Sequence, residues 1–128
     1  MKILLDTNFI IACVKENIYF DSLADKLFSE EIEWIIPQDV LNELGNIKDT
    51  HGIMVKDREA ALLSFEILKH LKHTVVELPG KNPNVDIKIV NYLIDNPQVV
   101  LATMDKDLKS RVKNKILSVR GKGKLGIV

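Results

Sequence analysis

The stretch Lys2-Ile3-Leu4-Leu5-Asp6-Thr7-Asn8 opens the chain with a short apolar run that ends in a carboxylate. An apolar run of this length predicts a buried strand. The acid that closes it, Asp6, is followed at once by Thr7 and Asn8, which is more polar chemistry than a turn usually needs. A plain helix cap is the alternative role for Asp6. The stretch therefore predicts an internal strand with a carboxylate at its end.

Further apolar and β-branched runs predict strands at 34–36, 74–78, 99–102 and 116–119, with a candidate edge strand at 125–128. Apolar residues at helical spacing predict helices at 8–14, 20–28, 40–47, 57–72 and 84–95, and a short one that ends near Lys113. We expect a polar turn from Gly45 to Gly52. Strands that alternate with helices and are apolar on both faces predict an α/β fold with a parallel sheet covered on both sides.

The composition is that of one globular domain, with 128 residues, 46% hydrophobic and 28% charged. A chain of this size can bury a core without disulfides, and its single cysteine, Cys13, excludes an internal one. The apolar run at the start is too short for a signal peptide, and no stretch reaches the roughly 20 apolar residues of a membrane helix. We therefore expect a cytoplasmic protein that does not act in a membrane.

Charge is divided unevenly along the chain, although the formal net charge at pH 7 is zero. Residues 106–128 hold eight basic residues and one acid, whereas residues 1–105 hold ten basic and seventeen acidic residues. Such segregation is typical of proteins that bind a polyanion, and a solvated helix with a frayed tail is the alternative. The basic residues that would contact the polyanion are Lys106, Lys109, Arg111, Lys113, Arg120, Lys122 and Lys124.

Four acids stand out by their positions relative to the predicted strands and helices. Asp6 ends the first predicted strand, and Asp105 follows the fourth. Ligands of open α/β sheets bind beyond the carboxyl ends of the strands, where the strand order reverses. Asp6 and Asp105 would share that crevice if the first and fourth strands are neighbours. Glu43 projects from the helix after the second strand, and Asp86 lies in the first turn of the helix before the fourth.

Carboxylates that converge repel one another and resist burial, so a fold tolerates them when a cation neutralises the cluster. Oxygen ligands select hard cations such as Mg²⁺ or Mn²⁺, and Mg²⁺ leaves positions open for phosphate oxygens. This is the plan of a metal-dependent phosphodiesterase. Each acid also has a structural alternative, because Asp86 suits a helix N-terminus, Glu43 could face solvent and Asp105 could cap the next helix.

These acids and their neighbours resemble the four signature blocks of PIN domains. The blocks are Asp6-Thr7-Asn8, Val40-Leu41-Asn42-Glu43-Leu44, Asp86-Ile87-Lys88-Ile89 and Ala102-Thr103-Met104-Asp105-Lys106-Asp107-Leu108. The resemblance runs from Lys2 to about Val119, in the order and spacing of the family. It implies a three-layer α/β/α fold whose parallel sheet has about five strands in the order 3-2-1-4-5. It also implies a Mg²⁺- or Mn²⁺-dependent ribonuclease domain over residues 1–120, with a basic tail or edge strand at 121–128.

The resemblance implies roles for individual residues. The metal-binding and catalytic acids are Asp6, Glu43, Asp86 and Asp105. Asp107 resembles a variable fifth acid, and Asn8 and Thr103 resemble supporting polar residues of the family. Asp39 lies one helical turn before Glu43 and matches no family position, so we prefer to interpret it as a first-turn acid of the helix. The basic residues named above would then bind RNA phosphates.

Within the family, the chain is most similar to archaeal PIN proteins related to the small-subunit rRNA-processing nuclease. Pro37 before Val40-Leu41, and the ending from Val119 to Leu125, carry this similarity. It implies rRNA processing with a ribosome-assembly partner. PIN toxins share the same acidic blocks, so two alternative functions remain. One is a toxin that pairs with an antitoxin, and the other is a non-cleaving RNA-binding assembly factor. A homodimer is a further candidate assembly.

Overall fold

A six-stranded sheet organises the chain in the computed structural model, which describes residues 1–49 and 55–128. Its strands are β1 (Lys2–Leu5), β2 (Glu33–Pro37), β3 (His73–Val76), β4 (Val100–Ala102), β5 (Ile116–Val119) and β6 (Leu125–Ile127). The order is β3-β2-β1-β4-β5-β6; the first five strands are parallel and β6 is antiparallel to β5. The expected order 3-2-1-4-5 is confirmed, and the candidate edge strand forms as β6.

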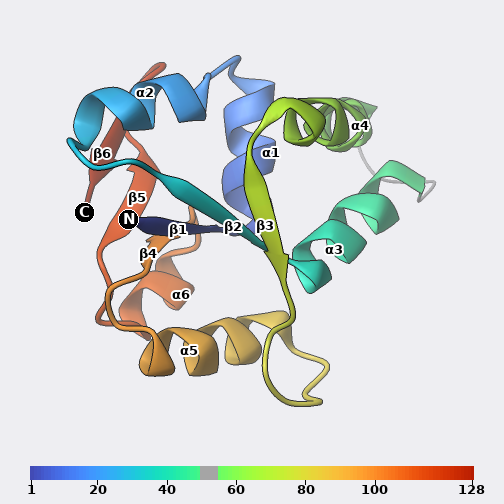
Figure 1. Ribbon diagram of the computed structural model, residues 1–128. Helices are drawn as coiled ribbons and strands as arrows, with labels where there is room; N and C mark the ends of the chain where they lie inside the picture. Colours follow the sequence, from blue (N-terminus) through green and yellow to red (C-terminus); the bar gives the residue numbers. More distant parts are fainter. Residues whose placement is uncertain (50–54) are drawn as a thin grey trace.

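Helices cover both faces of this sheet. They are α1 (Thr7–Lys15), α2 (Phe20–Leu27), α3 (Gln38–Asp49), α4 (Val55–His70), α5 (Val85–Asp95) and α6 (Lys106–Ser110). Figure 1 shows α1, α2 and α4 above the sheet, α5 and α6 below it, and α3 beside the end of β2. The three-layer α/β/α architecture expected from the alternation of strands and helices is therefore confirmed.

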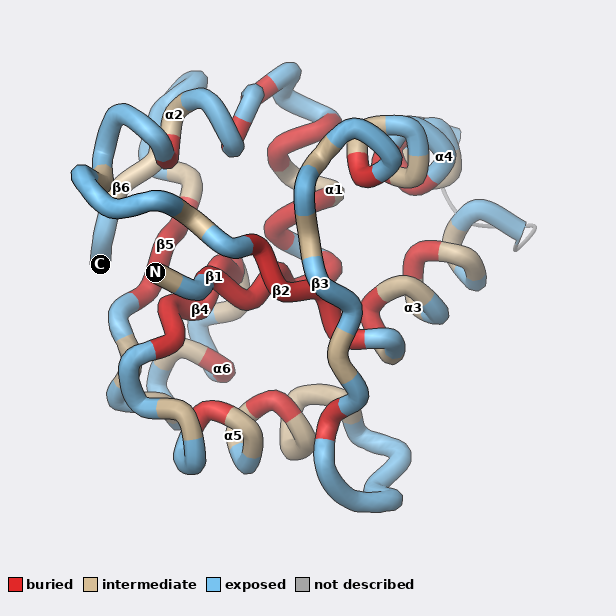
Figure 2. Tube along the Cα trace, in the orientation of Figure 1, coloured by how far each residue is buried: buried red, intermediate tan, exposed pale blue. Residues whose placement is uncertain are grey.

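The core is divided by the sheet into two apolar clusters. The upper one includes Phe9, Phe20 and Trp34, whose rings meet edge to face with centroids 5.7 and 5.3 Å apart. The lower one includes Leu4 of β1 and Ile89 of α5. Successive residues of a strand face opposite sides, so one strand supplies both clusters. Figure 2 shows the middle strands buried along their length, which fixes the positions of the loops at their ends.

The boundaries of several elements differ from those expected. β1 ends at Leu5, and Asp6 instead caps α1. The turn expected from Gly45 does not begin there, because α3 continues through Gly45 to Asp49. A glycine inside a helix costs roughly 1 kcal/mol, which burial of the helix face at Leu44 can offset. The remainder of that expected turn, residues 50–52, lies outside the described residues.

The C-terminal part also differs in detail. The helix expected to reach Lys113 ends at Ser110. β5 and β6 are joined by a tight turn in which Gly121 and Gly123 have φ angles of 63° and 66°. That region of backbone space favours glycine, because a side chain would clash there. The glycines of the basic ending therefore form a defined turn at the carboxyl end of β5.

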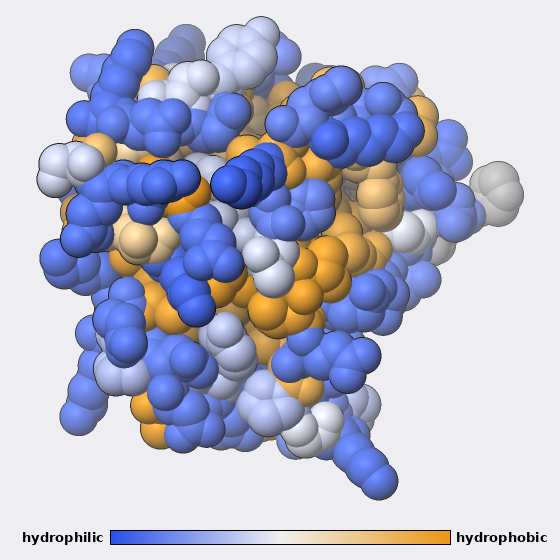
Figure 3. All heavy atoms as spheres, viewed as in Figure 1, coloured by the Kyte–Doolittle hydropathy of each residue, from blue (hydrophilic) through white to orange (hydrophobic). Residues whose placement is uncertain are grey.

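β3 is the exposed edge of the sheet, with Val75 44% accessible to solvent. Figure 3 shows apolar side chains gathered in the middle of the face that carries β3, surrounded by polar ones. Within residues 1–49 and 55–128, no helix has both the length and the apolar character that a bilayer crossing requires.

Candidate active site

Asp6 lies at the junction of β1 and α1, where it is only 4% exposed. Its Oδ1 accepts a hydrogen bond of 2.9 Å from the backbone N–H of Thr7. Its Oδ2 accepts one of 2.8 Å from the hydroxyl of Thr103. Thr103 comes directly after β4, the parallel neighbour of β1, so the strand order is what brings these two residues together. Each carboxylate oxygen keeps a lone pair that a cation could use.

Thr103 connects the loops after β1 and β4. It is fully buried, and its hydroxyl accepts a hydrogen bond of 3.1 Å from the backbone N–H of Asp105 while donating to Asp6. The side-chain oxygen of Asn8 lies 3.2 Å from the same hydroxyl and accepts a 2.9 Å bond from the backbone N–H of Met104. The two residues expected to support the site therefore fix the loop that carries Asp105.

Asp105 and Asp86 both lie at the start of a helix. Oδ1 of Asp105 caps α6, because it accepts from the backbone N–H groups of Asp107 and Leu108 at 2.9 and 3.3 Å. At α5 the cap is Asn84, whose side chain accepts from the backbone of Asp86. The cap role considered for Asp105 is thus present, and it occupies one carboxylate oxygen while orienting the other.

The four acids lie within reach of one another's charge. Burial raises the pKa of Asp6, and the negative charges of Asp86 and Asp105 raise it further. Burial also raises the pKa of Glu43, and the charge of Asp6 adds to this effect. For Asp86, burial comes first and the charge of Asp105 second. Carboxylates from α3, α5 and the loops after β1 and β4 therefore share one local electrostatic field.

The four acids do not form a complete set of metal ligands in this structure. Among residues 1–49 and 55–128, no group of three His, Cys, Asp or Glu side chains meets closely enough to enclose a metal ion. Mg²⁺ needs only one or two protein carboxylates and keeps several waters, so an open arrangement of acids is compatible with it.

The hydroxyl of Thr7 tests whether these residues suit a cation. Thr7 is 7% exposed, and its Oγ1 is buried without a hydrogen-bond partner within the described residues. It lies near Glu43, whose pKa it lowers, without making a well-formed hydrogen bond. An unpartnered buried hydroxyl beside an all-oxygen donor set fits a hydrated hard cation, whose waters can supply the missing bond.

Asp107 and Asp39, the two acids with uncertain roles, each have a cationic partner. Asp107 forms an exposed ion pair with Arg111 at 2.9 Å. Asp39 forms a 2.7 Å ion pair with Lys88 of α5. The positive charge of Arg111 partly offsets the rise in the pKa of Asp86 that burial and the charge of Asp105 cause. The partner of Asp39 could not be predicted, because α3 and α5 are far apart in the sequence.

The basic residues of the C-terminal segment differ in their availability. Lys109 is half-buried, and its ammonium donates a 2.9 Å hydrogen bond to the hydroxyl of Ser118. Contact with a polyanion would require it to leave that hydroxyl. The exposed ones are Lys106, Arg111, Lys113, Lys115, Arg120, Lys122 and Lys124. The exposed basic residues therefore follow the loop of Asp105 and continue to the turn after β5.

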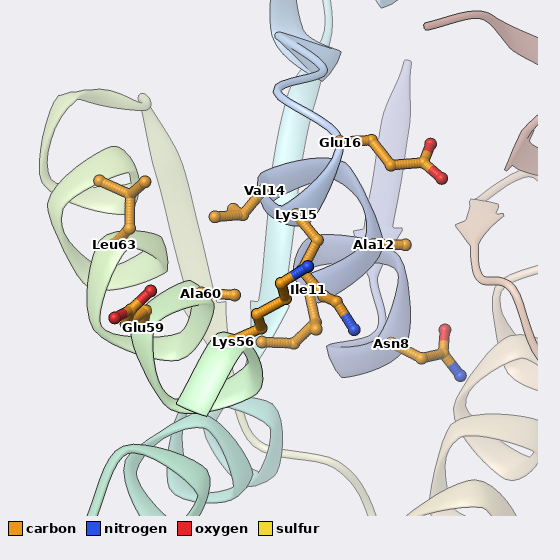
Figure 4. A pocket seen from close by; sticks show the side chains of 10 residues that line it. All are labelled: Asn8, Ile11, Ala12, Val14, Lys15, Glu16, Lys56, Glu59, Ala60 and Leu63. Atoms are coloured by element: carbon orange, nitrogen blue, oxygen red, sulfur yellow. The ribbon is translucent and has the colours of Figure 1, made fainter. Parts of the chain in front are cut away.

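A separate groove of about 680 Å³ runs between α1 and α4. Its floor is apolar, with Ile11, Ala12 and Ala60, and Lys56 lies on its rim. Figure 4 shows that Asn8, at the start of α1, points away from the side chains of α4. Among the described residues that line the groove, Asn8 is the one that contacts the loop of Asp105, and none of the four acids of the candidate site is included.

The raised pKa values predict how metal-free stability depends on pH. A carboxyl whose pKa is higher in the folded chain than its ordinary value, 3.8 for Asp6 and Asp86 and 4.5 for Glu43, binds protons more tightly when folded. Stability is therefore lost as pH rises from about 4 through the raised folded values. We expect Asp6→Asn to be more stabilising at about pH 7.5 than at about pH 4.5. Thermal melting of both proteins in chelator measures this, and a pH-independent difference would contradict it.

Comparisons with known proteins find similarity along most of the chain. A family model described as a PIN like domain matches residues 3–122. Ribonuclease VapC4 of Methanocaldococcus jannaschii is 30% identical over 111 residues, which cover 87% of this chain and 82% of that protein. The solved PIN domain endonuclease Utp24 has a TM-score of 0.80 at 24% identity, covering 98% of this chain and 90% of that one. VapBC2 from Rickettsia felis, solved with a DNA fragment from their promoter, has a TM-score of 0.64 at 13% identity, covering 94% and 100%.

Proposed function

This chain belongs to the PIN-like domain family, and from that premise we propose that it is a divalent-metal-dependent endoribonuclease. It would hydrolyse phosphodiester bonds in RNA with Mg²⁺ or Mn²⁺ as the cofactor. The relative from Methanocaldococcus jannaschii is named as a ribonuclease, which supports this activity. The resemblance to PIN domains implies products with a 5′-phosphate and a 3′-hydroxyl.

The single observation that carries the proposal is the shared field of four carboxylates at the carboxyl edge of the parallel sheet. Burial and neighbouring negative charge raise the pKa values of Asp6, Glu43 and Asp86 together. A fold gains no stability from such an arrangement, because each acid disfavours the ionisation of the others. Acids that are kept together although they lower the stability of the fold indicate a functional site. The carboxyl edge of the strands is also where open α/β sheets bind ligands.

Asp6 and Asp105 would be the primary metal-binding residues. Asp6 is held at both oxygens by Thr7 and Thr103, so its orientation is set before any ligand arrives. Asp105 is held at one oxygen by the α6 cap. Glu43 and Asp86 would complete the site directly or through water. When bound, the cation would polarise the phosphate and lower the pKa of an attacking water.

The remaining residues would orient these acids and the RNA. Thr103 and Asn8 fix the loop of Asp105, so they act on the site through their hydrogen bonds. Arg111, which pairs with Asp107, would turn from it to a phosphate oxygen, since guanidinium groups pair well with phosphate. The other exposed basic residues would neutralise phosphates along the strand, which gives affinity without sequence preference.

Removal of the metal tests the activity directly. We expect the purified protein to cleave an end-labelled single-stranded RNA in Mn²⁺ or Mg²⁺ and to stop in excess chelator, because its own carboxylates cannot lower the pKa of water. Restored cleavage after dialysis into Mn²⁺ is the control for irreversible damage. Full activity in chelator, or no cleavage of any RNA with either metal, would sink the proposal.

Processing of rRNA, together with a ribosome-assembly partner, is the biological role that we propose for this activity. It rests on the similarity of the ending from Val119 to Leu125 to archaeal PIN proteins. The toxin role is the second candidate, favoured by the 30% identity to Ribonuclease VapC4. A short neighbouring reading frame for a DNA-binding protein, with growth arrest on expression, would favour the toxin; neighbouring ribosomal genes would favour rRNA processing. The non-cleaving assembly factor predicts neither cleavage nor growth arrest.

A further inference from the structure

An ion pair joins the two helices that carry Glu43 and Asp86. Lys88 Nζ of α5 lies 2.7 Å from Asp39 Oδ2 of α3, and the two side chains are only 15% and 26% exposed. The surface pair Lys69–Glu66, by comparison, has side chains 67% and 57% exposed. Shielding from water strengthens a charge pair and makes the loss of one partner costly. The Asp39–Lys88 pair is therefore a stronger interaction than an exposed surface ion pair.

This pair lies beside the acids of the candidate site. Asp39 is one helical turn before Glu43, on the same face of α3, and its negative charge raises the pKa of Glu43. Lys88 follows Asp86 by two residues in the first turns of α5. Figure 1 shows the starts of α3 and α5 at the same end of the sheet. The pair thus connects the two acid-bearing helices near their N-terminal ends.

Within the described part of the chain, the buried apolar residues of these two helices belong to different core clusters. The buried residues of α3, Val40 and Leu44, belong to the upper cluster. The buried residues of α5, Ile89 and Leu93, belong to the lower one. Each helix is therefore packed on its own face of the sheet, and repulsion between Glu43 and Asp86 acts to separate their ends. Burial raises the pKa of Glu43 and the negative charge of Asp86 raises it further, which indicates that this repulsion is present.

We propose that Asp39 and Lys88 are positioning residues, which hold Glu43 and Asp86 at the spacing that a bound divalent cation requires. The inference rests on the proposed metal-dependent function. Mg²⁺ and Mn²⁺ accept a narrow range of ligand geometries, so a wider crevice would lose affinity even though its acids remain. The ion pair opposes the repulsion between Glu43 and Asp86 and keeps the N-terminal ends of α3 and α5 together.

Substitution of Lys88 separates this role from a simple effect of charge. If Lys88 acted only through its charge, Lys88→Met would make the site more negative and tighten the binding of a divalent cation. If it holds the helices, the same substitution weakens binding, by roughly 10-fold or more, the range seen when residues that orient metal ligands are lost. The two interpretations therefore predict opposite signs for one measurement.

The experiment is a Mn²⁺ titration of the whole chain without RNA, followed by calorimetry or by the electron paramagnetic resonance signal of free Mn²⁺. Lys69→Met is the matched control, because it removes the same charge from an exposed ion pair on α4. We expect weaker Mn²⁺ binding in Lys88→Met, no change in Lys69→Met and near wild-type binding in Lys88→Arg. The charge reversal Asp39→Lys with Lys88→Asp should recover most of the affinity, because it restores the pair with the local net charge unchanged.

Each outcome decides the inference. Unchanged or tighter Mn²⁺ binding in Lys88→Met overturns it, even if the wild-type chain binds Mn²⁺ and cleaves RNA, so the proposed function then stands alone. If Lys88→Met does not fold, the charge reversal decides: recovered affinity supports the inference and weak binding overturns it. A wild-type chain that binds no Mn²⁺ overturns the proposed function and this inference together.

Discussion

Replacement of Asp6 by Asn is expected to abolish RNA cleavage while the metal-free chain stays at least as stable as the wild type. The carboxylate is 4% exposed and both its oxygens accept hydrogen bonds. Asn keeps the shape and an oxygen acceptor for the backbone N–H of Thr7, and its amide can donate to the Thr103 hydroxyl. It removes the buried charge that the pKa of Asp6 shows to be unfavourable in the metal-free chain.

Cleavage and melting temperature are measured on the same preparations. Asp105→Asn should behave like Asp6→Asn, because its carboxylate belongs to the same field. Asp95→Asn is the matched control, since Asp95 is exposed at the C-terminal end of α5 and is not one of the four acids of the candidate site. Full cleavage by Asp6→Asn contradicts the proposed function. A lower melting temperature in chelator contradicts the electrostatic argument but leaves the function intact.

Replacement of Thr103 by Val should lower both stability and metal affinity. Val has the same shape, but it removes the donor to Asp6 Oδ2 and the acceptor for the backbone N–H of Asp105. The buried carboxylate of Asp6 and the part-buried N–H of Asp105 would each lose a partner, which costs roughly 1–3 kcal/mol of unfolding free energy. Loss of residues that orient metal ligands typically lowers metal affinity or activity by about 10- to 100-fold.

Denaturant unfolding and a Mn²⁺ titration measure these two effects. Thr103→Ser keeps the hydroxyl and should retain most of the affinity. Thr74→Val is the matched control, since it removes an exposed hydroxyl of β3 that makes a 3.3 Å bond. The loss in Thr103→Val should shrink in the Asp6→Asn background, because the two residues act through one hydrogen bond. Equal losses in both backgrounds would show that Thr103 acts independently of Asp6.

Local sequence patterns predicted most of the secondary structure. Apolar and β-branched runs predicted all six strands near their observed positions, although only the central strands are buried on both faces. The helix with Asn84 as its cap began where expected, since the cap signal is itself local. The end of α3 was wrong, because tertiary burial of Leu44 outweighs the helix-breaking tendency of Gly45. Residue patterns thus fail first where long-range packing opposes a local preference.

The candidate site was less predictable from local pattern. Asp6 and Asp105 could be assigned to one crevice only on the condition that β1 and β4 are neighbours, a condition that the structure meets. Glu43 and Asp86 came from the resemblance to PIN domains, since neither has a pattern that distinguishes it from a surface acid. Thr7 and Lys88 were missed, because an unpartnered hydroxyl and an ion pair between helices exist only in three dimensions.

The sequence by itself determined the alternation of strands and helices, the carboxylate at the end of the first strand and the uneven charge of the two parts of the chain. These features depend on residue type and on spacings of a few positions, so they can be predicted from the local sequence alone. Only the tertiary structure decided which acids share one electrostatic field and which lysine joins the two helices that carry Glu43 and Asp86. Residues as far apart as Asp6 and Thr103, or Asp39 and Lys88, meet through strand order and helix packing, and no local pattern encodes either.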